Sequence, residues 1–167
     1  MFYSIYKDSV NDIVTHVVEC STTKGNLTID IRKHWAPLGA GQFLKLVDHE
    51  KRFFKDLPFF RVCPRYITQF GVKYGWNDGT EGISTILDDP SLVGKREMDF
   101  GYLFFAGSGI NSRRSELVIS FCELDGCQQT GLGHAFWEVP FGSIRAENGG
   151  YDVLRAIEVC WDEGCLN

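Results

Sequence analysis

The sequence lacks the features of several protein classes. Its 17 lysines and arginines are outnumbered by 22 aspartates and glutamates, which gives a formal net charge of −5. A nucleic-acid-binding domain normally needs a basic face, so we expect no nucleic-acid partner. No apolar run approaches the length of a membrane-spanning helix. The first ten residues also lack the charged-then-apolar order of a signal peptide. We therefore expect a cytoplasmic protein if Met1 is the native start, and a protein of the secretory lumen if a leader has been removed.

The sequence also lacks a recognisable metal or redox motif. Its four histidines are scattered without the spacing of metal ligands: His16, His34, His49 and His134. No cysteine pair has the Cys-x2-Cys spacing that is typical of zinc sites and dithiol redox centres. We therefore expect no metal and no other cofactor.

Cysteine itself is not scarce, and its pattern allows two interpretations. The six cysteines include two pairs with a Cys-x4-Cys spacing, Cys122/Cys127 and Cys160/Cys165. In the cytoplasm these would be reduced, partly buried thiols, which is the commoner case, whereas in an oxidising lumen they would form local disulfides. A glycosylation sequon at Asn26 fits the second compartment, although such short motifs often occur by chance.

The remaining composition is that of one domain, residues 1–167, with a sizeable core to which 13 phenylalanines contribute. Residues 17–20 and 27–32 read as strands on either side of a turn at residues 23–26, which predicts a hairpin. No repeat, low-complexity tract or linker divides the chain.

Two helices are predicted. The first is expected to begin at Ala36-Pro37, because proline suits the first helical turn. Its apolar face would contain Phe43, Leu46 and Val47, which follow a spacing of three and four. The second is expected at residues 151–157, directly after a glycine pair.

Short apolar runs lie between the helices, at residues 102–106, 117–121 and 139–144. Many short strands separated by turn residues predict a mainly β fold, a closed antiparallel barrel whose ends the two helices cover. An interior filled by phenylalanine leaves no cavity for a sugar or lipid. Residues 1–16 are an N-terminal extension in which residues 2–6 alternate like a strand, so they are a candidate for an extra edge strand.

Residues 59–71 read FFRVCPRYITQFG. This segment resembles the active-site strands of the cyclophilins, a family of peptidyl-prolyl isomerases with the pattern Phe-His-Arg-Val-Ile-x-x-Phe-Met-x-Gln-Gly-Gly. The arginine, one pocket aromatic and the glutamine recur at the family spacing as Arg61, Tyr66 and Gln69. The resemblance extends in order through residues 25–37, 43–47, 104–119, 140–144 and 151–154. It implies a closed barrel of eight antiparallel strands capped by two helices.

The resemblance also implies a site that needs no nucleophile, metal or cofactor. Arg61 matches the catalytic arginine that donates to the prolyl nitrogen, and Gln69 matches the glutamine that braces it. The matching substrate-binding positions are Phe60, Tyr66, Ile67, Ala106 and the backbone of Gly107. Taken alone, each of these side chains also fits plain surface or core packing, so only their joint spacing favours a site.

Several positions depart from the family pattern. Glu116 replaces a glutamine that contacts the substrate backbone, and a carboxylate only accepts hydrogen bonds. It is also expected to pair with Arg61, which would make Glu116 harder to protonate. Val118 replaces a pocket phenylalanine, and Gly107 replaces an asparagine. The segment 127–138 is longer than in the family, so His134 and Trp137 are candidates for the missing pocket residues from shifted positions.

The sequence therefore leaves two functions open. The first is a peptidyl-prolyl cis-trans isomerase of reduced activity, which the retained Arg61, Tyr66, Ile67 and Gln69 favour. The second is a catalytically weak or inactive module of the same fold that binds proline-containing segments or a protein partner, which Glu116 and the other departures favour. In either case we expect a monomer whose partners are proline-containing peptides or proteins.

Overall fold

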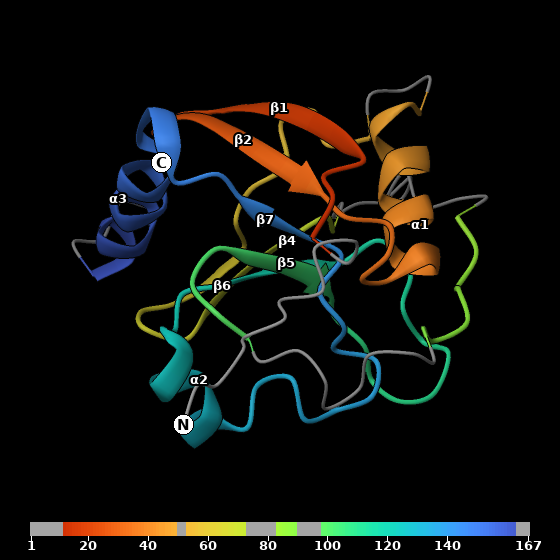
Figure 1. The fold of residues 1–167 in the computed structure, drawn as a ribbon. Helices are drawn as coiled ribbons and strands as arrows, with labels where there is room; N and C mark the ends of the chain where they lie inside the picture. The colour runs from red at the N-terminus through yellow and green to blue at the C-terminus, as the bar shows by residue number, and fades with distance from the viewer. Residues whose placement is uncertain (1–11, 50–52, 73–82, 90–97, 163–167) are drawn as a thin grey trace, which may run out of the picture.

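The computed structural model describes residues 12–49, 53–72, 83–89 and 98–162. In this part of the chain seven strands form one curled antiparallel sheet in the order β1-β2-β7-β5-β6-β4-β3 (Figure 1). The strands are β1 (His16–Thr22), β2 (Gly25–Ile31), β3 (Arg61–Cys63), β4 (Ile67–Phe70), β5 (Tyr102–Phe105), β6 (Leu117–Ser120) and β7 (Gly142–Ile144).

The predicted hairpin is confirmed, since β1 pairs with β2 in register from His16 opposite Ile31 to Thr22 opposite Gly25. The runs at residues 102–106 and 117–121 are β5 and β6, which pair with each other. Strand β7 is shorter than the predicted run, and it begins just after Pro140. Proline has no backbone N–H with which to extend a ladder.

The two faces of the sheet bury different sets of side chains, because successive residues of a strand point to opposite sides. Leu103, Phe105, Leu117 and Ile119 lie on the inner face, in the larger core with Phe43 and other aromatic residues. The alternate residues of the same strands point outward to a second, smaller cluster. Its buried members are Ile67, Met98, Phe104, Val118, Cys122, Cys127 and Leu132.

The two predicted helices are confirmed and lie at opposite ends of the curled sheet (Figure 1), where both add buried residues to the larger core. Helix α1 (Pro37–Val47) begins at the expected proline and buries Phe43 and Leu46. Helix α3 (Gly150–Asp162) follows a short 3-10 turn, η1 (Glu147–Gly149), and contacts both β2 and β3. In the described part of the chain, no helix combines the length and the apolarity needed to cross a membrane.

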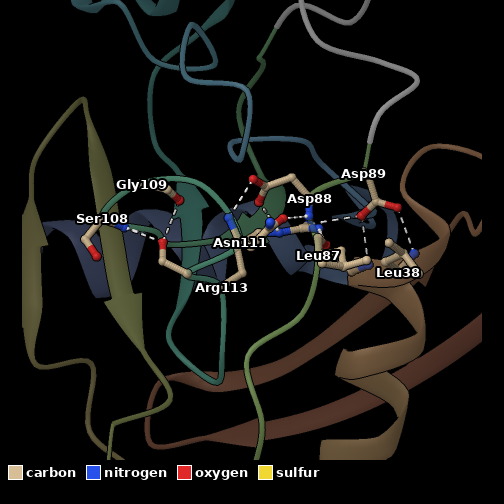
Figure 2. A network of polar contacts seen from close by, with 10 residues as sticks. Leu38, Leu87, Asp88, Asp89, Ser108, Gly109, Asn111 and Arg113 are labelled. Carbon is tan, nitrogen blue, oxygen red and sulfur yellow. Dashed lines mark hydrogen bonds and ion pairs between the residues drawn. The ribbon is translucent and has the colours of Figure 1, made fainter.

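Helix α1 obtains its N-terminal cap from a distant segment. Its N-cap residue, Ala36, provides no side-chain hydrogen bond. Instead the buried carboxylate of Asp89 accepts the N–H groups of Leu38 (2.8 Å) and Gly39 (2.9 Å) (Figure 2). Asp89 also pairs with Arg113 at 3.0 Å, and both side chains are fully buried. The cap of α1 therefore depends on a buried ion pair between two loops.

A third helix, α2 (Leu124–Thr130), was not predicted. It overlaps the start of the segment 127–138, and a disulfide joins Cys127 within it to Cys122, which follows β6 by two residues. The expectation of reduced thiols is therefore wrong for this pair, and the alternative of a local disulfide holds. Cys20 and Cys63 are free. The second pair, Cys160 and Cys165, falls outside the side chains that the structure describes.

Closure of the sheet into an eight-stranded barrel stays a prediction. Within residues 12–162, excluding the undescribed gaps, the sheet has seven strands, with β1 at one edge and β3 at the other. The proposed edge strand at residues 2–6 lies outside the described residues.

Candidate functional site

The register of four strands brings the predicted site residues onto the outer face of the sheet. Arg61 on β3 lies opposite Gln69 on β4, and Gln69 lies opposite Val118 on β6. Glu116 precedes Val118 by two residues and therefore shares its face. It is also the backbone partner of Ala106, whose N–H donates to its carbonyl oxygen at 3.0 Å.

Three polar side chains form a continuous hydrogen-bonded chain on this face. Arg61 Nη1 donates to Gln69 Oε1 at 2.8 Å, and Gln69 Nε2 donates to Glu116 Oε1 at 2.7 Å. The predicted contact between Arg61 and Gln69 is therefore present. Because both ends of its amide are used and Gln69 is only 7% exposed, its orientation is fixed. Arg61 itself is exposed, and among the described residues its guanidinium has one acceptor, Gln69 Oε1.

The expected direct pairing of Glu116 with Arg61 is not what the structure shows. Among the described ion pairs none joins these two residues, and the amide of Gln69 lies between them instead. Burial raises the pKa of the Glu116 carboxyl, and the positive charge of Arg61 lowers it by less. The expectation that Glu116 is harder to protonate is therefore wrong, because loss of hydration outweighs the separated charge.

The apolar residues predicted for the site lie under and beside this polar chain. Ile67 and Val118 are buried, at 5% and 2% exposure, so they form a floor rather than a rim. Tyr66 and Ala106 are half-buried and pack against the same outer cluster. The face therefore places an exposed cation beside an apolar surface.

Of the two candidate residues in the segment after α2, His134 and Trp137, only Trp137 lies at the site. Glu138 Oε2 accepts the N–H of Gly133 at 2.8 Å and holds the loop in a compact turn. The half-buried indole of Trp137 then lies directly on Gly107, where an added Cβ would be 2.6 Å from Trp137 Cδ1. A side chain at position 107 is therefore incompatible with this position of Trp137.

The other two predicted binding residues are less closely associated with the chain of polar groups. Phe60 immediately precedes β3, and its N–H donates to the carbonyl oxygen of Gln69 at 3.0 Å. His134 is exposed in the turn after α2. Within the described residues, no hydrogen bond or ion pair joins its imidazole to Arg61, Gln69 or Glu116.

Sequence reasoning missed the buried residues that support the site. Phe104 lies opposite Val118 and carries the outer cluster across to β5. Phe104 lies two residues before Ala106 in a strand, so the sequence could have placed both side chains on the same face of the sheet. Met98 and Leu132, which belong to the same cluster, gave no such signal because neither lies in a strand. Within the described chain, no group of three or more acidic, histidine or cysteine side chains is arranged to hold a metal.

Comparison with known proteins gives the family context of this geometry. Residues 17–164 match the model of the cyclophilin type peptidyl-prolyl cis-trans isomerase/CLD family. Peptidyl-prolyl cis-trans isomerase-like 2 of Aspergillus oryzae is 28% identical over 102 residues, which cover 60% of this chain and 18% of that protein. A putative thylakoid lumen peptidyl-prolyl cis-trans isomerase of Synechocystis sp. is 43% identical over 54 residues, which cover 32% of this chain and 14% of that protein. The matched parts span less than a fifth of these curated relatives.

A solved structure has the same fold. It is a cyclophilin type peptidyl-prolyl cis-trans isomerase of Cryptosporidium parvum, crystallised in the presence of the dipeptide Ala-Pro. The two structures agree with a TM-score of 0.66 over 87% of this chain and 86% of that one, at 20% sequence identity. The family match covers most of the chain and the fold agrees with it, so the chain belongs to the cyclophilin type peptidyl-prolyl cis-trans isomerase family.

Proposed function

We propose that the outer face around Arg61 and Gln69 catalyses cis-trans isomerisation of X-Pro bonds in polypeptides. The observation that carries the proposal is the hydrogen bond from Arg61 to Gln69, which orients an exposed guanidinium beside an apolar cluster. Family membership supports this activity. The substrates are proline-containing peptides or proteins, and one copy of the chain supplies every residue that the mechanism uses.

The chemistry requires only selective binding of the twisted amide. Rotation about the bond meets a barrier of ~18–20 kcal/mol, because the planar amide is conjugated. In the twisted form the lone pair of the prolyl nitrogen is localised and accepts a hydrogen bond that the planar forms cannot accept. A guanidinium is a fixed fork of N–H donors, and Arg61 has further donors beyond the one that Gln69 accepts. A donor that favours the twisted form lowers the barrier without covalent chemistry.

The apolar half of the face would hold the proline ring. Tyr66 and Ala106 are half-buried and lie at its surface, while Ile67 and Val118 form the floor. The Gly107 backbone and the indole of Trp137 would border the bound chain on the β5 side. Glu116 is expected to reduce the rate on ordinary peptides, since its carboxylate accepts hydrogen bonds but donates none when ionised.

The test is the isomerisation rate of an Ala-Pro peptide, followed by NMR exchange or by a protease-coupled assay. Arg61→Ala should lower kcat/KM at least tenfold, since losing the cation removes more than about 1.4 kcal/mol of transition-state preference. Arg65→Ala is the matched control, because Arg65 is an exposed cation in the β3–β4 turn. Equal losses in both variants, or none in Arg61→Ala, would refute the role given to Arg61.

A second candidate is a module of this fold that binds proline-containing segments without turning them over. Glu116 favours this binding function, because its carboxylate accepts a hydrogen bond from Gln69, the residue that orients Arg61. The same peptide distinguishes the two functions: shifts in its NMR signals without exchange enhancement would indicate binding alone.

The disulfide between Cys122 and Cys127 supports a location in an oxidising compartment. The thylakoid lumen named for the Synechocystis relative is compatible with such a location. Alkylation of the protein isolated from its own cells, followed by mass spectrometry, tests this placement. Alkylated Cys122 and Cys127 would exclude it.

A further inference from the structure

Glu116 has one carboxylate oxygen for which the described residues supply no hydrogen-bond donor. Its Oε1 accepts a hydrogen bond from Gln69 Nε2 at 2.7 Å. No hydrogen bond or ion pair in the described part of the chain involves Oε2. The side chain is half-buried, and burial is the largest influence on its pKa. An ionised carboxylate in this position has lost part of its hydration and regained only one donor.

The position of Glu116 places this oxygen next to any chain bound at the proposed site. Glu116 pairs with Ala106 across the β5–β6 ladder, and it shares a face with Gln69, which Arg61 contacts. A peptide whose proline lies over Arg61 and whose backbone follows Ala106 and Gly107 would pass beside Glu116. The neighbouring residues of that peptide are therefore the groups available to the free oxygen.

We propose that Glu116 selects proline segments that carry a lysine or arginine beside the proline. This inference rests on the proposed function and names its substrate class. A cationic side chain supplies the N–H donors and the positive charge that the carboxylate lacks, and such charge-assisted bonds are stronger than neutral ones. An acidic side chain at the same place would meet a like charge. Glu116 would therefore distinguish peptides by the charge of the residue beside the proline, whereas an uncharged glutamine at this position would not.

The other charges near the site define where the cation must lie. Arg61 is the charged group whose field acts on Glu116, and the Gln69 amide lies between them. A substrate cation on the Arg61 side would be repelled, so the selected residue must lie on the Ala106 side of Glu116. The choice between the residue before and the residue after the proline then follows from the direction of the bound chain.

The experiment uses peptide pairs that are identical except for one residue flanking the proline, either lysine, glutamine or glutamate, placed before it or after it. We measure kcat/KM by NMR exchange and, independently of turnover, Kd by titration of the peptide into the protein. The wild type should favour lysine over glutamate by about tenfold on one side of the proline, as expected for a partly desolvated pair. In Glu116→Gln the ratio should fall below about twofold.

A matched control separates a local contact from the general negative charge of the chain. Glu19→Gln makes the same change in net charge as Glu116→Gln. Glu19 is exposed on β1, where it accepts a hydrogen bond from Thr28, and β1 is at the edge of the sheet opposite to β3. It should keep the full tenfold ratio. A lysine preference that survives in Glu116→Gln, or that is lost equally in Glu19→Gln, would overturn the assignment to Glu116.

The outcomes also separate this inference from the proposed function. Turnover of all the peptides with equal kcat/KM in the wild type would refute the selection and leave the isomerase intact. Charge-selective Kd values without turnover would support the selection and favour the binding module. Neither turnover nor binding with any peptide would refute both.

Discussion

Asp89 is a fully buried carboxylate and Glu116 a half-buried one, and the described contacts of the two differ. Asp89 is fully buried and accepts hydrogen bonds from Leu38, Gly39 and Arg113 (Figure 2). Glu116 is half-buried and accepts one side-chain hydrogen bond, from Gln69. The charge of the first carboxylate is balanced by Arg113, whereas the second has one oxygen without a hydrogen-bond donor among the described residues.

The number of hydrogen-bond donors around each carboxylate distinguishes a structural role for Asp89 from a binding role for Glu116. A buried charge is tolerated when several donors replace its lost water, and removing any of them is costly. A partly buried charge with few donors is costly to keep, so its presence points to a partner outside the fold. The segment 106–116 links the two, since Asn111 and Asp88 exchange backbone-to-side-chain hydrogen bonds between it and the loop that carries Asp89 (Figure 2).

The largest effect is expected from removing the carboxylate of Asp89. Asp89→Ala should lower the free energy of unfolding by about 3–5 kcal/mol, since it removes the fully buried partner of Arg113, which keeps only Asp88 as an ion-pair partner among the described residues, and it also removes the cap of α1. Denaturant unfolding measures the loss. Asp56→Asn, at an 84% exposed side chain whose left-handed backbone (φ 58°) asparagine also adopts, should change the stability by less than about 0.5 kcal/mol. Equal stability of the two variants would show that the buried pair does not hold the loop.

The next effect tests whether the loop positions Trp137 for the site. Gly107→Ala places a Cβ at 2.6 Å from Trp137 Cδ1, so the indole must move. We expect a cost of about 1–3 kcal/mol from overpacking, or a red-shifted tryptophan emission at unchanged stability if the ring swings out to solvent. Gly41→Ala is the control, because an added Cβ there meets nothing within 4 Å. A variant that changes neither stability nor emission contradicts the packing of Trp137 on Gly107.

A smaller effect is expected on the isomerisation rate when Glu116 is replaced. Glu116→Gln should raise kcat/KM on an uncharged Ala-Pro peptide, by about tenfold at most, since the amide can donate to the substrate chain. The assay compares it with the wild type on the same peptide, with folding checked by thermal melting. Equal or lower activity in a well-folded variant would place the limit on the rate elsewhere, in the loop that carries Trp137.

The smallest effect is a pH dependence of stability. Burial raises the pKa of Glu116 above its ordinary value of 4.5 in the folded state. The folded protein therefore binds more protons than the unfolded chain between these two pKa values, and stability falls as pH rises through that window. The penalty is absent below pH 4.5 and complete above the raised pKa. Thermal melts should show Glu116→Gln slightly more stable than wild type near neutral pH, with the difference shrinking towards pH 4. If the stability difference between Glu116→Gln and the wild type grew on acidification, the pH dependence would have the opposite sign and would contradict a raised pKa of Glu116.

The sequence predicted the local elements well because their signals are local. Alternation gave the β1–β2 hairpin, and Pro37 with its following apolar spacing gave α1. The contact between Arg61 and Gln69 was also predictable, since a short turn joins β3 to β4 and sets their register. The role of each residue in catalysis stays a prediction that the proposed experiments test.

The tertiary structure alone decided how distant segments supply what local sequence lacks. The cap of α1 comes from Asp89, the Gln69 amide lies between Glu116 and Arg61, and the loop after α2 places the indole of Trp137 on Gly107. None of these contacts has a signature in neighbouring residues, because each depends on which backbone donors and which buried surfaces meet after the sheet has formed. The sequence by itself predicted the β1–β2 hairpin, helices α1 and α3 and the pairing of Arg61 with Gln69, because neighbouring residues carry these signals. Only the tertiary structure decided which polar groups have their charge balanced within the described fold, because this depends on how distant loops pack.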